Sequence, residues 1–335
     1  MRLPTPRWWY ERGRRRASPT RLLLKPIAAV WAGVTARRIA RTRPFDPGVP
    51  VICVGGLTLG GTGKTPVVRE IVDRLAARGV AAHALSRGYG GRLKGPLRVD
   101  PSLHAAGDVG DEPLMLARDH PTWIAADRIA GAVSAVACGA QAIVMDDGHQ
   151  NPSLKKTLSL VVVDGETRDG EWPFGDGDVF PAGPMREPLA VGLDRTDAVV
   201  LMLPADLDEP DPALWVLFGD TPILVARFEP LAPPPPGPQV GFAGVGKPWK
   251  IERALVAAGC DLVDFLPLPD HAGFTEATLN AIAARAERLG AGLVTTEKDW
   301  VRLPPAWRER VTAWPVRARF EDEAALDRLL ASAAP

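Results

Sequence analysis

Short apolar runs alternate with longer stretches of helical periodicity from residue 51 onward. The apolar runs have the length of buried strands and lie at residues 51–54, 81–85, 122–125, 142–145, 159–163, 197–203 and 223–228. Between them, the spacing of apolar positions predicts helices at residues 65–78, 113–118 and 127–138. Strands that alternate with helices in this way predict an α/β fold with a mostly parallel sheet.

A proline-rich segment interrupts this alternation. Prolines occupy positions 233–236 and 238, where they disfavour the interior of a sheet and favour a stiff, extended chain. The alternation then resumes, with strands predicted at residues 240–243, 262–266, 292–295 and 311–314 and helices at 249–258, 276–289 and 321–331. We therefore expect a larger α/β domain at residues 45–232, a linker at 233–239 and a smaller α/β domain at 240–335.

The first 44 residues differ in charge from the rest of the chain. They hold twelve lysines and arginines but a single acid, Glu11, and so carry a net charge of +11, which the remaining residues balance with −11. A basic arm on an acidic body indicates an anionic partner, either nucleic acid or a lipid surface.

Apolar residues within this arm recur at helical spacing, at Leu23, Ile27, Val30, Trp31 and Val34. The uncharged run at residues 26–36 is shorter than the roughly 20 residues that a membrane-spanning helix needs. One interpretation is a basic amphipathic helix that lies on an anionic membrane. The other is a core-packed helix with a solvated basic tail.

The clearest chemical signal is a glycine-rich turn between a predicted strand and a predicted helix. It consists of Gly60, Gly61, Thr62, Gly63, Lys64 and Thr65. In such a loop the backbone N–H groups bind phosphates, Lys64 reaches the β- and γ-phosphates, and the Thr65 hydroxyl binds Mg²⁺. The strict pattern G-x-x-x-x-G-K-[ST] would place its first glycine at Thr58, so the match has one departure. The alternative is a glycine-rich hairpin that merely precedes Lys-Thr.

Two acids follow a later predicted strand. Asp146 and Asp147 come directly after the apolar run at residues 142–145. P-loop enzymes bind Mg²⁺ with an acid at this point, although Asp-Gly is also a common turn pair at the end of a strand. A GTPase is disfavoured, because the string at residues 295–299 does not have the spacing of an N-K-x-D motif.

Seven short motifs stand in a fixed order along the chain. They are GGTGKTP at residues 60–66, SRGYGG at 86–91, GDEP at 110–113, DDGHQ at 146–150, PAGPMREP at 181–188, DHAGF at 270–274 and TTEKD at 295–299. As an ordered set, from about residue 20 to residue 300, they resemble the tetraacyldisaccharide 4′-kinases of lipid A synthesis.

The resemblance implies a P-loop NTPase-type fold and an activity that uses ATP and Mg²⁺. The expected reaction phosphorylates the 4′-hydroxyl of an acylated glucosamine disaccharide 1-phosphate. The expected location is the cytoplasmic face of the inner membrane, where the basic arm would dock on the anionic membrane surface. We expect no nucleic-acid partner, because the body of the chain is acidic.

The resemblance also suggests roles for single residues. Asp111 is expected to accept the proton of the sugar hydroxyl and to pair with His271 of the smaller domain, beside the catalytic Lys64. The expected metal ligands are Thr65, Asp146, Asp147, Glu112 and Glu187. Candidates for binding substrate or phosphate are Arg87, Tyr89, Arg128, Gln150 and Arg186, since a guanidinium binds phosphate in a bidentate fork.

The chain departs from the family pattern at two neighbouring positions. His149 stands where the family usually has an apolar residue, and Asn151 stands where it usually has a histidine. A catalytic role for either residue is left open. Two other functions compete with the lipid kinase: a membrane-recruited P-loop ATPase without a sugar substrate, and a nucleic-acid-binding protein with a vestigial loop.

Overall fold

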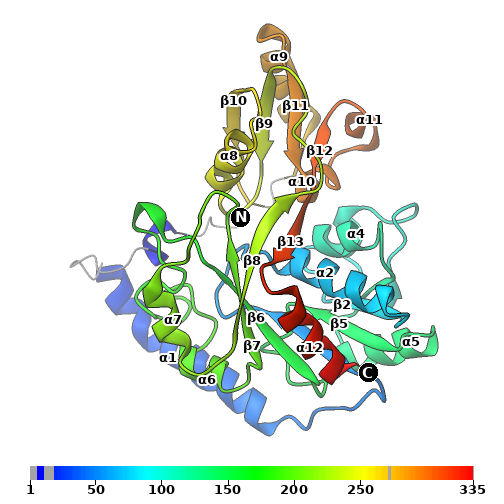
Figure 1. The fold of residues 1–335 in the computed structure, drawn as a ribbon, viewed down its shortest axis with the longest axis vertical. Coiled ribbons are helices and arrows are strands. Elements are labelled where there is room, and N and C mark those ends of the chain that lie inside the picture. The colour runs from blue at the N-terminus through cyan, green and yellow to red at the C-terminus, as the bar shows by residue number, and fades with distance from the viewer. Residues whose placement is uncertain (1–5, 11–18, 271–272, 335) are drawn as a thin grey trace.

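A nine-stranded sheet forms the centre of the larger domain in the computed structural model, which describes residues 6–10, 19–270 and 273–334 (Figure 1). In spatial order its strands are β13 (Val316–Phe320), β8 (Ile223–Pro230), β7 (Ala198–Leu203), β6 (Leu158–Asp164), β1 (Val51–Gly55), β5 (Ala142–Asp146), β2 (Ala82–Ser86), β4 (Thr122–Ile124) and β3 (Leu97–Arg98). Seven of these strands run parallel, and the edge strands β13 and β3 are antiparallel to their neighbours. The mostly parallel α/β sheet predicted from the alternation is therefore confirmed.

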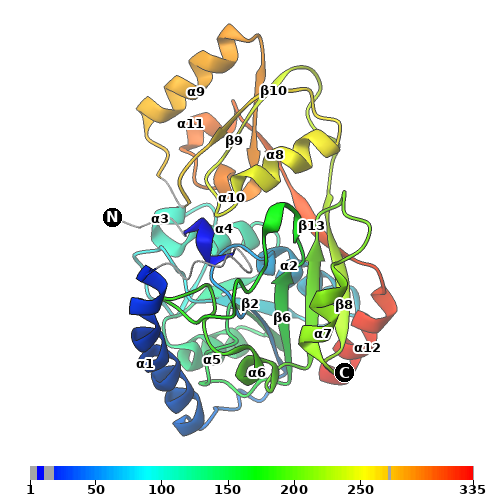
Figure 2. The same cartoon turned by 90° about the vertical axis from the view of Figure 1, so that its left-hand side faces the viewer.

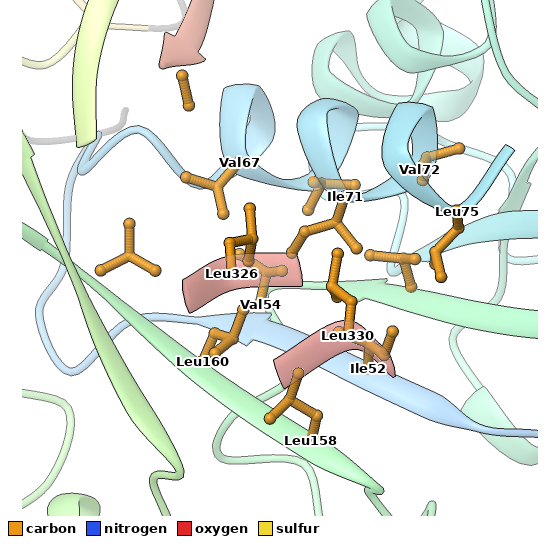
Figure 3. Packing of buried hydrophobic residues seen from close by; sticks show 14 of the residues in the cluster. Ile52, Val54, Val67, Ile71, Val72, Leu75, Leu158, Leu160, Leu326 and Leu330 are labelled. Carbon is orange, nitrogen blue, oxygen red and sulfur yellow. The ribbon is translucent and has the colours of Figure 1, made fainter. Parts of the chain in front are cut away.

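One face of this sheet is covered by two helices from opposite ends of the chain. They are α2 (Lys64–Ala77) and α12 (Glu323–Ala333). Ile71 of α2 and Leu330 of α12 belong to one hydrophobic core with Ile52 of β1 (Figure 3). Removing such side chains from water is the main favourable contribution to folding, so the last helix helps to hold the first strand in place.

Helices α5 (Arg128–Ala137), α6 (Leu189–Leu193) and α7 (Pro212–Phe218) cover the opposite face. Successive side chains of a strand point to opposite faces, and Val51 and Cys53 of β1 accordingly join the core beneath α5. Both faces of β1 are thus buried, as its continuous apolar run predicted. Four short helices complete the larger domain: η1 (Arg7–Trp9), α3 (Ala106–Val109), α4 (Asp111–Leu116) and η2 (Arg168–Gly170).

The smaller domain has a parallel sheet of four strands. In spatial order these are β10 (Leu262–Pro267), β9 (Gln239–Ala243), β11 (Gly292–Thr296) and β12 (Thr312–Trp314). Its helices are α8 (Pro248–Ala257), α9 (Glu276–Arg288), α10 (Glu297–Trp300) and α11 (Pro305–Arg308). Phe242, Leu279 and Trp307 are buried in a core of their own, so this domain packs around a separate centre.

The C-terminal residues correct the expected boundary of the smaller domain at residues 240–335. β13 pairs antiparallel with β8 in the larger sheet, with Val316 opposite Pro230 and Phe320 opposite Ala226. The following helix α12 buries Leu330 in the core of the larger domain. The chain therefore enters the smaller domain after β8 and leaves it before β13, next to the point of entry (Figure 1).

The basic arm forms a long helix, α1 (Pro19–Arg41), along the outside of the larger domain (Figure 2). Its inner face buries Arg21, Ala28 and Thr35. Its large apolar side chains are mostly exposed, although the Trp31 ring also contacts Phe180; the exposed ones are Leu22, Leu23, Ile27, Val30, Trp31 and Val34. The core-packed alternative is therefore wrong for this helix. Among the described residues, none of the helices combines the length and the hydrophobicity needed to cross a membrane.

Candidate active site

The glycine-rich turn connects the buried strand β1 to α2, as the sequence predicted. Gly63 precedes α2 with a φ of 90°, a conformation that favours glycine. A Cβ atom at this position would also lie 2.7 Å from the Phe228 ring. The turn therefore has the strand–loop–helix arrangement of a phosphate-binding loop, with the N-terminus of α2 directed into it.

The first half of the loop is extended, which explains why Thr58 can stand where the strict pattern has glycine. Thr58 forms an antiparallel bridge with Met185. On either side of it, the Leu59 N–H donates to Pro184 O at 2.9 Å, and the Arg186 N–H donates to Leu57 O at 2.7 Å. An extended residue needs no glycine, because the β region is open to every L-amino acid.

Asp146 lies beside this loop and has no hydrogen-bond partner for either carboxylate oxygen among the described residues. It ends β5 and pairs in register with Val54 of β1, and only 1% of its surface is exposed. Burial, together with the negative charges of Glu112 and Asp147, raises the pKa of Asp146 to about 8. A buried carboxylate in need of a cation fits the Mg²⁺ ligand that the sequence predicted.

Asp147 is engaged by an arginine instead. Arg186 donates to its two carboxylate oxygens at 2.6 and 2.9 Å, and Lys64 Nζ lies 3.8 Å from Oδ1. Burial would raise the pKa of Asp147, but the charges of Arg186 and Lys64 outweigh burial and hold it well below its ordinary value. Arg186 Nε also donates to Thr58 O at 3.0 Å. The predicted phosphate ligand Arg186 thus connects Asp147 to the loop.

Glu187 and Gln150 form a second group next to Arg186. The Gln150 side-chain amide donates to Gly56 O and to Glu187 Oε1, each at 2.9 Å. Both oxygens of Glu187 accept from Arg195 at 2.7 Å. In the described part of the chain, no three acidic, histidine or cysteine side chains are close enough to hold a metal ion. Gln150 and Glu187 therefore lie next to the loop, but the five predicted metal ligands do not form a single cluster among the described residues.

Asp111 and Glu112 face a lysine of the smaller domain. Asp111 opens α4 and is 5% exposed. Lys298 Nζ lies 2.8 Å from Glu112 Oε1 and 3.9 Å from Asp111 Oδ2. Burial opposes the charge of Lys298, but the two carboxylates outweigh it and raise the pKa of this lysine. His271 lies outside the described residues, so its pairing with Asp111 remains a prediction.

Lys298 is the residue of this candidate site that sequence reasoning missed. It lies in the TTEKD motif, which was recognised only as a family signature. The adjacent Glu297 accepts two hydrogen bonds from Arg69 of α2, at 2.8 and 2.9 Å. This motif therefore holds the smaller domain against the helix that follows the phosphate loop. The alternating charges of Glu297, Lys298 and Asp299 were the sequence feature that could have indicated a charged contact here.

A second charged group joins the two domains at the end of β6. Lys250 Nζ lies 2.6 Å from Asp164 Oδ2, and Lys247 Nζ lies 3.0 Å from the same atom and 2.7 Å from Glu171. Burial would raise the pKa of Asp164, but the two lysines outweigh it and lower this pKa to about 2. Burial disfavours the charged form of both lysines. For Lys250 the effect of burial is the larger one, and its pKa is lowered. For Lys247 the nearby carboxylates outweigh burial, and its pKa is raised.

Three of the predicted substrate residues come from the segments that follow β2 and β4. Arg87 and Tyr89 are exposed after β2, while Arg128 is buried at the start of α5. Burial and the charge of Arg87 lower the pKa of Arg128 to about 10, against the opposing effect of Asp147 and Asp146. The structure therefore places Arg87 and Arg128 within electrostatic range of each other and Arg128 within range of the Asp146 site.

His149 and Asn151 have structural partners. The two ring nitrogens of His149 lie 3.1 Å from Ser159 Oγ and 3.0 Å from Gly192 O, and only 1% of its surface is exposed. Burial, with the charges of Lys156 and Arg195, lowers the pKa of His149 to about 4. Asn151 Oδ1 accepts hydrogen bonds from the Ser153 N–H and hydroxyl. Both residues shape the turn after Asp147.

A parallel sheet with a phosphate loop at the end of a central strand, and an acid at the end of the neighbouring strand, defines an enzyme of the P-loop nucleotide-binding class. Residues 20–334 match the family model described as tetraacyldisaccharide-1-P 4′-kinase. The chain therefore belongs to the tetraacyldisaccharide 4′-kinase family, as the seven motifs indicated.

Individual relatives agree with this membership. The chain is 69% identical to the tetraacyldisaccharide 4′-kinase of Caulobacter vibrioides strain NA1000, over 98% of each chain. It is 68% identical to that of Phenylobacterium zucineum, again over 98% of each. A crystal structure of LpxK from Aquifex aeolicus in complex with ATP superposes with a TM-score of 0.74 at 25% identity, covering 94% of this chain and 100% of that one. The fold class, the kinase activity and the use of ATP are thus confirmed.

Proposed function

We propose that the chain transfers the γ-phosphate of ATP to the 4′-hydroxyl of tetraacyldisaccharide 1-phosphate at the cytoplasmic surface of the inner membrane. The observation that carries this proposal is the convergence of two acid groups on one site. The buried Asp146, which has no hydrogen-bond partner among the residues that the structure describes, lies beside the phosphate loop. It is within electrostatic range of Glu112, which with Asp111 lies where the smaller domain supplies Lys298. Family membership supports the identity of the acceptor.

The loop and its lysine hold the nucleotide in this proposal. The backbone N–H groups at residues 60–65 and the Lys64 ammonium bind the phosphates. Asp146 and the Thr65 hydroxyl would hold Mg²⁺, whose charge, when it is bound, neutralises the phosphate oxygens. The remaining ligands would be phosphate and water oxygens, because Mg²⁺ usually keeps such ligands in nucleotide sites.

Asp111 is the proposed general base. It takes the proton of the 4′-hydroxyl while the sugar oxygen bonds to the γ-phosphorus and the bond from that phosphorus to the β–γ bridging oxygen breaks, which releases ADP. Lys298 orients the pair of carboxylates, and His271 is the proposed partner of Asp111. Arg128 and Arg87 are the proposed ligands for phosphate groups, because Arg128 lies within electrostatic range of Arg87, Asp146 and Asp147 and a guanidinium binds phosphate in a bidentate fork.

The outer face of α1 is the proposed membrane contact. Its apolar part includes Leu23 and Val30, which are 76% and 66% exposed, and its C-terminal part exposes Arg37, Arg38 and Arg41. Apolar side chains beside cations suit the interface of an anionic membrane, where the lipid acceptor lies. We expect no nucleic-acid partner.

An acceptor assay tests the reaction. The chain with ATP, Mg²⁺ and tetraacyldisaccharide 1-phosphate should form the 1,4′-bisphosphate. Asp111→Asn should lower kcat by about 10²- to 10⁴-fold and leave the KM for ATP nearly unchanged, because a general base acts in the transition state. ATP hydrolysis without a sugar product would favour the P-loop ATPase alternative, and an undiminished kcat in the variant would refute the base assignment.

Vesicle flotation tests the membrane contact. Replacing Ile27 and Val30 with serine should reduce binding to vesicles that contain anionic lipid, because each substitution removes an exposed apolar side chain. The matched control is Val216→Ser on α7, which removes an 82% exposed apolar side chain from another surface. Equal binding by all three proteins would exclude α1 as the docking surface.

A further inference from the structure

A short N-terminal segment, residues 6–10, lies directly against the phosphate loop. The Tyr10 hydroxyl donates to Leu59 O at 2.5 Å, across 49 positions of sequence. The Trp172 N–H donates to the Tyr10 carbonyl at 2.6 Å and fixes the backbone of this segment. Gly60 fits closely beneath the tyrosine, because a Cβ atom there would lie 3.0 Å from the Tyr10 hydroxyl. Tyr10 therefore touches the loop at the residues that begin its glycine-rich half.

This contact completes a set of three bonds to consecutive carbonyl groups of the loop. Leu57 O and Thr58 O accept from the backbone and side chain of Arg186, and Leu59 O accepts from Tyr10. A phosphate loop binds anions through N–H groups, so a carbonyl turned toward the phosphates would repel them. In a planar trans peptide the C=O and the following N–H point in opposite directions. Fixing Leu59 O therefore also fixes the direction of the Gly60 N–H.

The tyrosine ring also contacts the smaller domain. Lys247 Nζ lies 4.7 Å from the centre of the Tyr10 ring, within the range of a cation–π interaction. Lys247 itself is bound to Asp164 and Glu171 of the larger domain. Burial raises the pKa of Tyr10 to about 12, so its hydroxyl remains a proton donor at neutral pH. One side chain thus meets the phosphate loop with its hydroxyl and the smaller domain with its ring.

We propose that Tyr10 is a positioning residue for the nucleotide. Its hydroxyl holds the Leu59–Gly60 peptide in the orientation that binds phosphate, and its ring keeps Lys247 of the smaller domain next to the loop. The N-terminal segment accordingly completes the ATP site, a role separate from membrane docking by α1.

Nucleotide titration of the full chain with Tyr10→Phe tests this inference. The substitution removes the hydroxyl and keeps the ring over which Lys247 lies. The dissociation constant for Mg-ATP, measured without lipid, should rise about three- to tenfold, the effect of losing one hydrogen bond to a buried carbonyl. The KM for ATP should rise by the same factor, while the KM for the disaccharide and the binding to vesicles should stay at the wild-type values. Tyr10→Leu, which removes the ring as well, should weaken nucleotide binding further.

Trp8→Phe is the matched control in the same segment. The Trp8 ring packs against Trp9 and the Arg21 guanidinium, so this variant should keep the wild-type nucleotide affinity. Unchanged Mg-ATP affinity in Tyr10→Phe, or an equal rise in the KM for both substrates, would overturn the inference. The inference about Tyr10 rests on one part of the proposed function, namely that the phosphate loop binds Mg-ATP. A wild-type chain that binds Mg-ATP but forms no bisphosphate would refute the proposed function alone.

Discussion

Breaking the ion pair between Arg69 and Glu297, which joins the two domains, should cost several kcal/mol in the free energy of unfolding. Arg69 donates twice to Glu297, at 2.8 and 2.9 Å, and the two side chains are only 8% and 11% exposed. Glu297→Gln keeps the shape of the side chain and removes its charge. The arginine would then stay buried. Its remaining ion-pair partner among the described residues would be Asp119, which is 3.6 Å away and 57% exposed, and the charge of Asp73 also acts on it.

The size of the effect follows from this burial. Removing one partner of a buried ion pair typically costs about 3–5 kcal/mol, because the other charge stays desolvated. Asp119 compensates partly, so we expect a loss of about 2–4 kcal/mol in the free energy of unfolding. Glu297 also precedes Lys298, which contacts Asp111 and Glu112. The variant should therefore lose kcat as well as stability.

Urea unfolding followed by tryptophan fluorescence measures the change, since Trp300 and Trp307 report on the smaller domain. The control is Glu229→Gln, the same chemical change in a pair with the exposed Arg317, which should cost less than about 1 kcal/mol. The double variant Arg69→Met, Glu297→Met should be more stable than Glu297→Gln, because it leaves no buried charge. The reasoning is refuted if Glu297→Gln and Glu229→Gln lose the same free energy.

Three further predictions concern the loop and the second charged group. Gly63→Ala should destabilise the chain by more than about 1 kcal/mol and weaken Mg-ATP binding, because its φ is 90° and the new Cβ would meet Phe228; a wild-type melting curve and affinity would contradict this. Lys64→Ala should lower kcat/KM for ATP by at least about 10²-fold in the acceptor assay, and near-normal turnover would show that another group binds the phosphates. The pKa of Asp164 is lower in the folded chain than its ordinary value, so ionised Asp164 should add about 2 kcal/mol to the free energy of unfolding. This contribution should be fully present above about pH 5 and be lost as the pH falls toward about 2. Acid unfolding curves that coincide for the wild type and Asp164→Asn would exclude this contribution.

Local patterns predicted the parts of the molecule that local interactions determine. The apolar run of β1, the turn at Gly63 and the acid that ends β5 lie in short segments whose neighbours in sequence are also neighbours in space. The destination of β13 could not be predicted in this way. Its alternating pattern, with Arg317 and Arg319 exposed and Phe320 buried, suits an edge strand of either sheet. The strand joins the larger sheet because it pairs with β8, and the paired residues, such as Val316 and Pro230, are far apart in the sequence.

The same distinction applies to the site. The loop residues and Asp146 were predicted because their spacing carries the chemistry. Lys298 was missed because its contact with Glu112 joins residues 186 positions apart. The sequence also left the role of His149 undecided, since a histidine after two acids is compatible with catalysis and with packing. Its burial and its bonds to Ser159 and Gly192 give it a structural role.

The late return of the chain to the larger sheet has a consequence for biosynthesis. Leu326 and Leu330 of α12 fill the core around β1, although they are synthesised after the whole of the smaller domain. The smaller domain, by contrast, has all of its strands between residues 239 and 314. On the ribosome the inserted domain can therefore fold first. The ATP-binding domain, although its phosphate loop is synthesised before the inserted domain, closes its core only after α12 has been released.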